Sequence, residues 1–195
     1  MTYALIPIQR VAAPAPDDEF LVMRALSGDH WAEEALYRRH VGDVLCLARR
    51  MLRNDADAED VVQDVFVSAF DELEDLQNAD RFGAWVRRMT VNRVYKRMRR
   101  QRLRRLLGLD RTFEACAPLA SQASERAGQE ARADLRIIDR ALDRLGAAER
   151  IAWILRRLHG HSLGEVADLV GCSLATAKRR IARADGVVKT LMEGP

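Results

Sequence analysis

Residues 162–184 read SLGEVADLVGCSLATAKRRIARA, a stretch that predicts a helix, a glycine turn and a second helix. Ser162 and Glu165 have the spacing of a capping box, in which two side chains satisfy free N–H groups at a helix start. Gly171 stands where the backbone must turn left-handed to end that helix. Ser173 can then cap a second helix, so the stretch predicts a helix-turn-helix.

The second helix of this motif presents a polar and cationic face, formed by Thr176, Lys178, Arg179, Arg180 and Arg183. Such a face can lie in the major groove of DNA, where phosphate contacts position a protein and base contacts specify the sequence. An ordinary helical hairpin with a solvated basic face would show the same pattern. The motif alone leaves both interpretations open.

The hydrophobic periodicity of the sequence is interrupted before this motif, which divides the chain into two parts. Helical periodicity covers residues 131–158. Residues 108–128 instead contain scattered Gly, Pro, Ser, Ala and Gln without sustained periodicity, which is typical of a linker. We therefore predict a flexible linker at 107–131 and a C-terminal domain at 132–195.

Residues 17–106 show a helical pattern almost without interruption, with apolar residues at spacings of three and four. In the second helix of this region, Trp31 and Tyr37 fall on the apolar side. In the last helix the apolar residues thin out beyond Met89, which predicts a basic arm that leaves the core. Residues 1–16 predict a disordered tail. The expected fold class is all-α, with two small helical domains joined by a flexible linker.

Charge is divided along the first domain. Ten acidic and no basic side chains lie between residues 55 and 80, and ten basic and no acidic ones between 87 and 105, although the net charge is only +3. The spacings of three, four and seven between Asp57, Asp60, Asp64, Asp71 and Asp75 place these five acids in one outward stripe of a helix. Opposite charge blocks predict two oppositely charged partners. A solvated helix face is the alternative for the acids.

The composition is that of an ordinary globular protein, with 48% hydrophobic and 31% charged residues among 195. Three cysteines without CxxC spacing indicate a reducing cytoplasm rather than a disulfide framework or a zinc site. Cys46 and Cys172 are expected in the core. The chain shows no convincing signal peptide or membrane span, so we expect a cytoplasmic protein. We expect no metal, no cofactor and no catalytic residue.

Several motifs together resemble one family. They are Ser27-Gly28-Asp29 with Glu34-Ala35-Leu36-Tyr37-Arg38-Arg39, Asp57-Ala58-Glu59-Asp60-Val61-Val62-Gln63-Asp64-Val65-Phe66, Phe82-Gly83-Ala84-Trp85 with Asn92, and Thr176-Ala177-Lys178-Arg179-Arg180-Ile181. Residues 18–105 resemble the region-2 domain, and residues 132–192 the region-4 domain, of bacterial RNA polymerase sigma factors of the extracytoplasmic-function group. This group belongs to the sigma-70 family.

The resemblance implies a transcription initiation subunit that directs core RNA polymerase to specific promoter DNA. The acidic helix would dock on the polymerase clamp through five residues, which are Asp57, Glu59, Asp60, Gln63 and Asp64. Members of the group are commonly held inactive by an anti-sigma factor, so the resemblance also implies this second protein partner.

The resemblance further assigns DNA contacts to both domains. Region 2 would recognise and melt the minus-10 element through Asn78, Asp80, Arg81, Arg87, Arg88, Asn92, Arg93, Lys96 and Arg97. Region 4 would read the minus-35 element through Ser173, Thr176, Lys178, Arg179, Arg180 and Arg183. Trp85 shares the inner stripe of its helix with Phe82 and Met89, so we expect it in the core rather than as a platform for a base.

A few positions depart from the pattern of the family. Ala177 is smaller than the usual aliphatic residue, and Asp185-Gly186 interrupts a helix end that is usually basic, which could kink the helix. Gly83-Ala84 replaces a polar pair, and Lys96 stands where an acid is frequent. These departures bear on the promoter sequence rather than on the family.

Two other classes of function fit parts of the sequence. A helix-turn-helix regulator that binds DNA alone would explain the C-terminal motif but leaves the acidic stripe unused. An enzyme could hold a divalent metal for phosphoryl chemistry on Asp57, Asp60 and Asp64, which share one helix face. No His, Lys or glycine-rich phosphate loop accompanies these carboxylates.

Overall fold

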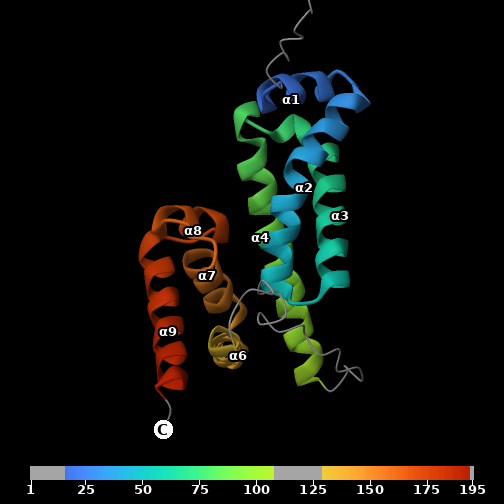
Figure 1. The fold of residues 1–195 in the computed structure, drawn as a ribbon. Helices are drawn as coiled ribbons and strands as arrows, with labels where there is room; N and C mark the ends of the chain where they lie inside the picture. The colour runs from blue at the N-terminus through green and yellow to red at the C-terminus, as the bar shows by residue number, and fades with distance from the viewer. Residues whose placement is uncertain (1–15, 108–128, 194–195) are drawn as a thin grey trace, which may run out of the picture.

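The computed structural model describes residues 16–107 and 129–193, and the regular elements in these ranges are all helices (Figure 1). In chain order they are α1 (Asp18–Leu26), α2 (His30–Leu52), α3 (Asp55–Asp71), the short 3-10 turns η1 (Leu73–Asp75) and η2 (Ala79–Arg81), α4 (Phe82–Leu106), α6 (Gln129–Asp143), α7 (Ala147–Arg157), α8 (Leu163–Val170) and α9 (Leu174–Met192). The predicted all-α fold is confirmed. The predicted tail, except Pro16, and most of the predicted linker lie outside the described residues.

Helices α1–α4 form an N-terminal unit in which α2, α3 and α4 lie side by side and α1 crosses their end (Figure 1). The core of this unit is made of buried aliphatic and aromatic side chains, including Leu36, Val44, Met51, Val65, Phe82 and Val86. Asp18 fastens α1 to α2, because its carboxylate pairs with Arg39 at 2.6 Å and with His40 at 2.8 Å. Burial of a side chain such as Leu36 stabilises the fold by about 1.5–3 kcal/mol.

Three residues of α2 lie on the surface, contrary to the sequence prediction. Trp31 and Tyr37, expected on the inner side, are exposed, and Cys46, expected in the core, is exposed as well. The buried stripe of α2 passes instead through neighbours such as Ala32 and Leu47. Adjacent residues of an α-helix are rotated by about 100°, so a side chain next to a buried one can face solvent.

Helices α6–α9 form a C-terminal unit. The inner face of α9 consists of buried residues at helical spacing, which are Ala177, Ile181, Ala184 and Val188. The helix runs through Gly186 without a break. Asp185 turns back to the unit, where it accepts hydrogen bonds from Trp153 Nε1 at 3.0 Å and from Arg157 Nη2 at 2.7 Å.

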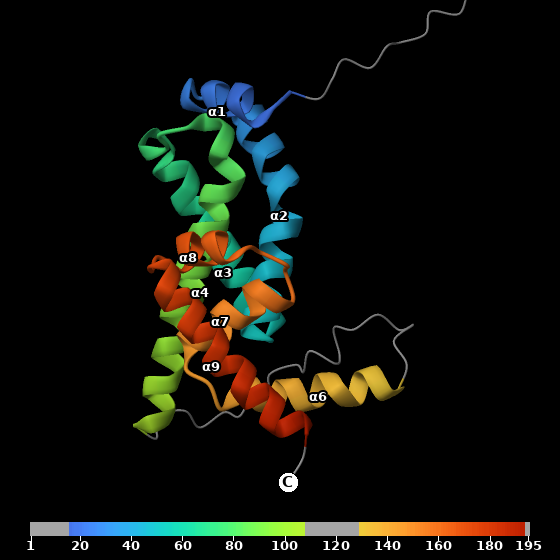
Figure 2. The same ribbon diagram turned by 90° about the vertical axis from the view of Figure 1, so that its left-hand side faces the viewer.

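The two units pack against each other along α4, which contacts both α7 and α8 (Figure 2). The expected basic arm is therefore not a free extension: beyond Met89, the side chains of Val91 and Val94 are still buried. Helix α3 lies on the side of the N-terminal unit that faces away from the C-terminal unit (Figure 1). The second domain thus covers one side of α4 and leaves α3 uncovered.

Arginines from both units hold this interdomain contact together. Arg53 is buried, and its guanidinium donates to Asp139 at 2.7 Å and also pairs with Asp143. Arg150 donates to the backbone oxygen of Met51 at 3.0 Å. Burial would lower the pKa of Arg53, but the hydrogen bond to Asp139 and the charge of Asp143 outweigh it and hold that pKa above its ordinary value. We call the Arg53 pairs with Asp139 and Asp143 the Arg53 latch.

The free energy of unfolding is expected to decrease below pH 6.5 because of His159, which lies beside this contact. Burial, the charge of Arg50 and the charge of His161 lower the pKa of His159 from 6.5 to about 4. The unfolded chain therefore binds the proton first, so the stabilisation is complete above pH 6.5 and is lost as the pH falls toward 4. Urea unfolding on either side of pH 6.5 measures this loss. The free energy of unfolding of His159→Gln should decrease less than that of the wild type. Equal decreases in both proteins would show that His159 does not cause the pH dependence.

None of the helices within 16–107 and 129–193 is both long and apolar enough to cross a membrane.

Candidate protein-docking and nucleic-acid interfaces

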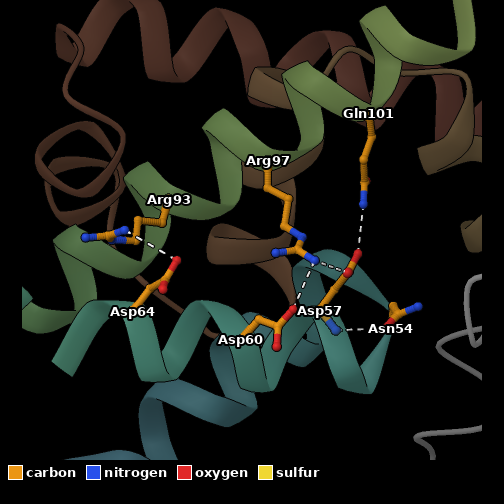
Figure 3. A network of polar contacts seen from close by, with 7 residues as sticks. All are labelled: Asn54, Asp57, Asp60, Asp64, Arg93, Arg97 and Gln101. Carbon is orange, nitrogen blue, oxygen red and sulfur yellow. Dashed lines mark hydrogen bonds and ion pairs between the residues drawn. The ribbon is translucent and has the colours of Figure 1, made fainter. Parts of the chain in front are cut away.

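The acids of α3 and the bases of α4 meet across one flank of the N-terminal unit (Figure 3). Asp64 Oδ2 lies 3.5 Å from Arg93 Nη1, and Asp60 Oδ2 lies 3.3 Å from Arg97 Nη2. Asp57 also pairs with Arg97 and accepts a hydrogen bond of 2.7 Å from Gln101. We call these contacts the α3–α4 ion-pair network. Residues predicted to serve two different partners thus neutralise each other within the chain.

The members of this network differ in their exposure. The side chain of Asp57 is 19% exposed, whereas those of Asp60 and Asp64 are 65% and 63% exposed. Burial would lower the pKa of Arg97, but the hydrogen bond and charge of Asp57 and the charge of Asp60 outweigh it and raise that pKa. Two of the three carboxylates therefore remain open to a partner in solution.

The five polymerase-docking candidates are divided between two flanks of α3. Asp57, Asp60 and Asp64 face α4, whereas Glu59 and Gln63 lie at a groove on the other flank, between α2 and α3. Glu59 is held there by Arg49 of α2, whose Nη2 lies 3.0 Å from its carboxylate. The five polymerase-docking candidates therefore surround α3 without forming one patch.

The α2–α3 groove is mostly apolar. Its lining consists of Tyr37, Val41, Leu45, Val62, Phe66, Val67 and Phe70, with Glu59 and Gln63 as its polar members. The rings of Tyr37 and Phe66 meet edge to face with centroids 4.8 Å apart. An apolar strip with a polar rim is typical of protein-docking surfaces. The groove could not be predicted while Tyr37 was expected in the core.

The minus-10 candidates occupy three different settings. Asn78, Asp80 and Arg81 are exposed in the connection that precedes α4, and Arg88, Asn92 and Lys96 are exposed at spacings of four along it. We call these last three residues, with Arg100, the α4 ridge. Arg93 and Arg97 belong to the ion-pair network. Arg87 lies near α8, where its charge adds to the hydrogen bonds from Ser162 that lower the pKa of Glu165.

The structure gives a physical setting for Gly83, which departs from the family pattern, and for its neighbour Trp85. A Cβ atom on Gly83 would lie 2.7 Å from the ring of His40, so a side chain here requires the ring to move. That ring is itself held by Asp18. Trp85 is half-buried and packs edge-on against Phe82, with centroids 6.2 Å apart, which agrees with its predicted place at the core.

Local hydrogen bonds build the C-terminal motif as predicted. Ser162 Oγ accepts from the N–H of Glu165 at 3.2 Å, while the Glu165 carboxylate accepts from the N–H of Ser162 at 2.7 Å. Gly171 has φ +66°, in the left-handed region. Ser173 then caps α9 by accepting from the N–H of Thr176 at 3.3 Å. The predicted helix, turn and second helix are confirmed.

The minus-35 candidates on α9 differ in availability. Lys178 and Arg179 are exposed near the start of the helix, and Arg180 is half-buried. Arg183 is exposed but lies 3.6 Å from Glu149 of α7. Ser173 and Thr176 bond to each other through their hydroxyl groups at 2.9 Å. The cationic contact surface of α9 is therefore centred on Lys178 and Arg179.

The geometry does not suit the metal site considered for Asp57, Asp60 and Asp64. These carboxylates face arginine side chains of α4 rather than one another. Within the parts of the chain that the structure describes, no three His, Cys, Asp or Glu side chains are grouped so that they could hold a metal ion.

Comparison with known proteins gives matches over both units. The family described as "Sigma-70 region 2" matches residues 36–104, and the family "Sigma-70, region 4" matches residues 135–184. The chain is 30% identical over 176 residues to RNA polymerase sigma factor NccH of Alcaligenes xylosoxydans xylosoxydans, covering 90% of this chain and 95% of that protein. It is 29% identical over 167 residues to ECF RNA polymerase sigma factor SigM of Mycobacterium tuberculosis (strain ATCC 25618 / H37Rv), covering 86% and 80%.

Two solved structures are similar over most of the chain. One is CnrH in complex with the cytosolic domain of CnrY, with a TM-score of 0.60 and 27% identity, covering 90% of this chain and 97% of that one. The other is the sigma factor RpoE in complex with the anti-sigma factor NepR from Bartonella quintana. Its TM-score is 0.61 at 25% identity, and it covers 82% of this chain and 96% of that one.

Proposed function

The chain belongs to the extracytoplasmic-function group of the sigma-70 family, and from this premise we propose how its surfaces direct core RNA polymerase to promoters. The N-terminal unit docks on the polymerase clamp and binds the minus-10 element, while the C-terminal unit reads the minus-35 element. The observation that carries this proposal is the acid-rimmed apolar groove in the same chain as a basic helix-turn-helix. A regulator that acts alone on DNA has no use for such a groove.

Docking on the clamp uses both flanks of α3. The α2–α3 groove supplies apolar area, which gives most of the affinity in protein interfaces, and Glu59 and Gln63 supply polar contacts at its edge. Asp60 and Asp64 supply exposed negative charge on the other flank. Complementary charge steers association and rejects wrong partners, so the partner surface is expected to be basic.

Promoter melting uses the α4 ridge and the connection before α4. Arg88, Lys96 and Arg100 provide cationic groups at regular spacing that can follow a phosphate backbone. Asn78, Asp80 and Arg81 are exposed at the end of this track and can contact the edge of an unstacked base. The positions of these residues support a single-stranded path along α4.

The closed arrangement of the two units supports regulation by a second protein. Contacts of α7 and α8 with one side of α4 fix the distance between the exposed α4 ridge and the exposed cations of α9, so a partner that holds this arrangement would restrict which promoters both surfaces can reach together. Two similar structures have sigma factors bound to a partner protein, an anti-sigma factor in the case of RpoE. We propose that an anti-sigma factor likewise holds this chain in an inactive form.

Run-off transcription on genomic DNA, with core polymerase and the purified chain, tests the function directly. Specific transcripts with sequenced start sites are expected only when both components are present. A pull-down with core polymerase separates this function from that of a regulator that binds DNA alone. A chain that binds promoter DNA but neither binds core polymerase nor yields transcripts would favour the regulator.

The double substitution Arg179→Ala with Arg180→Ala is expected to reduce transcription about tenfold from promoters that have a minus-35 element. Loss of a phosphate or base contact costs about 1–3 kcal/mol, and each 1.4 kcal/mol is about tenfold. The measurement is the run-off yield on matched promoters with and without the element. Arg136→Ala with Arg140→Ala, which removes two exposed arginines of α6, is the control. Equal yields from both double variants would place recognition elsewhere.

A further inference from the structure

We propose that the α3–α4 ion-pair network is a charge exchange that couples polymerase docking to DNA binding. In the free chain, Asp60 and Asp64 occupy Arg97 and Arg93. Basic side chains of the polymerase take over these two carboxylates on docking, and the released guanidinium groups then bind DNA phosphates. This exchange rests on the function proposed above and adds a link between its two surfaces.

The register of the two helices makes the exchange stepwise. Asp64 lies against Arg93, Asp60 against Arg97, and Asp57 against both Arg97 and Gln101 (Figure 3). The first two pairs have exposed carboxylates and distances of 3.3–3.5 Å, so a competing cation can reach them. Asp57 is mostly buried and bonds two α4 side chains. It keeps α3 and α4 aligned while the outer pairs change partners.

The acids also explain how DNA is kept away before docking. Arg93 and Arg97 share a surface groove with Asp64, Glu72, Met89, Asn92, Lys96 and Arg100. This groove therefore continues the α4 ridge and carries carboxylates inside its basic track. A phosphate that approaches it meets negative charge at short range, and repulsion at such distances is only partly screened by salt. Neutralising Asp64, and Asp60 beside the groove, leaves Glu72 as the one acid among the lining residues and makes the groove more cationic.

Thermodynamic linkage makes the coupling reciprocal. If docking on polymerase strengthens the DNA contact by some factor, DNA must strengthen docking by the same factor. In the free chain the ion pairs of Asp60 and Asp64 weaken the binding of polymerase and also the binding of DNA. Binding of either partner breaks these pairs and so favours binding of the other. Polymerase and DNA would therefore bind this domain with positive cooperativity.

Asp60→Asn with Asp64→Asn tests the exchange, because asparagine keeps the shape of each side chain and removes only its charge. The free, full-length variant should bind a fluorescein-labelled single-stranded oligonucleotide more tightly than the wild type. In this variant Arg93 loses its carboxylate partner, whereas Arg97 loses Asp60 but keeps Asp57. An arginine that newly binds a phosphate makes the slope of log K against log salt concentration steeper by about 0.7, so we expect about 0.7 from Arg93 and a smaller change from Arg97. Asp64→Asn alone, which releases only Arg93, should make the slope steeper by about 0.7.

A matched control separates the exchange from a change of net charge. Asp71→Asn with Glu74→Gln removes the same charge from exposed positions of the same region. In addition, the Asp60/Asp64 substitutions should have no effect on the slope in a chain that carries Arg93→Gln and Arg97→Gln, since the guanidinium groups that bind the phosphates are then missing. An unchanged slope, an equal gain in the control, or a gain that survives without the arginines overturns the proposal.

The outcome also distinguishes this coupling from the function on which it rests. If the wild type supports run-off transcription while the Asp60/Asp64 variant keeps the wild-type slope, only the exchange is wrong. If the wild type gives no transcripts with core polymerase, the proposed function fails whatever the slopes. Circular dichroism of each variant confirms that its helices are intact.

Discussion

Val67→Glu is expected to weaken binding to core RNA polymerase about thirtyfold or more. Val67 lies in the α2–α3 groove with 56% of its side chain exposed, so the substitution costs the free chain little. In the complex, a carboxylate at this position would be enclosed among apolar side chains without a partner, and such burial is costly. The loss of an interface hot spot amounts to about 2 kcal/mol or more.

The affinity of core polymerase for a labelled chain measures this effect. Met23→Glu is the matched control, because Met23 is 60% exposed on α1 and does not line the groove. Both variants should keep the wild-type helical content. The groove would be excluded as the docking surface if the two variants bound polymerase equally well.

Arg53→Gly is expected to open the interdomain contact. Arg53 has φ 57°, a conformation that glycine adopts without strain, so the substitution removes the guanidinium without adding backbone cost. It leaves Asp139, which is buried, without the cation that faces it at 2.7 Å. Breaking one side of a buried ion pair costs about 3–5 kcal/mol. This is a large share of the energy that can hold two small domains together.

The radius of gyration from small-angle X-ray scattering should therefore increase in Arg53→Gly. Asp143→Asn, at the more exposed end of the Arg53 latch, should change it less. The double variant Arg53→Met with Asp139→Leu should remain compact, because apolar side chains can replace a buried ion pair without loss. A compact Arg53→Gly chain would show that other contacts hold the units together.

Local chemistry explains which parts of the structure could be predicted from the sequence. The capping box of Ser162 and Glu165 and the left-handed Gly171 depend on residues three to nine positions apart, and the helix-turn-helix follows from them. The helical ranges follow from periodicity in the same way. Features of this kind need no knowledge of how helices pack.

The relations between helices could not be predicted. The sequence shows that Asp60 and Arg97 belong to opposite charge blocks, but not that α3 and α4 are rotated to face each other. Arg53 and Asp139 are 86 positions apart, and the residues around them in the sequence do not indicate that they pair. The exposure of Tyr37 likewise depends on the rotation of α2 against α3. These features are set by tertiary packing.

The turn between α2 and α3 consists of only two residues, Arg53 and Asn54, and it serves three purposes at once. The N–H of Arg53 donates to the backbone oxygen of Arg49 at the end of α2, and Asn54 caps α3 by accepting from the N–H of Asp57. The side chain of Arg53 meanwhile holds α6. Because the turn is so short, two neighbouring residues fix the end of α2, the start of α3 and the contact with α6. The turn therefore connects α3 directly to the C-terminal unit, and a change in the position of α3 is expected to disturb the Arg53 latch.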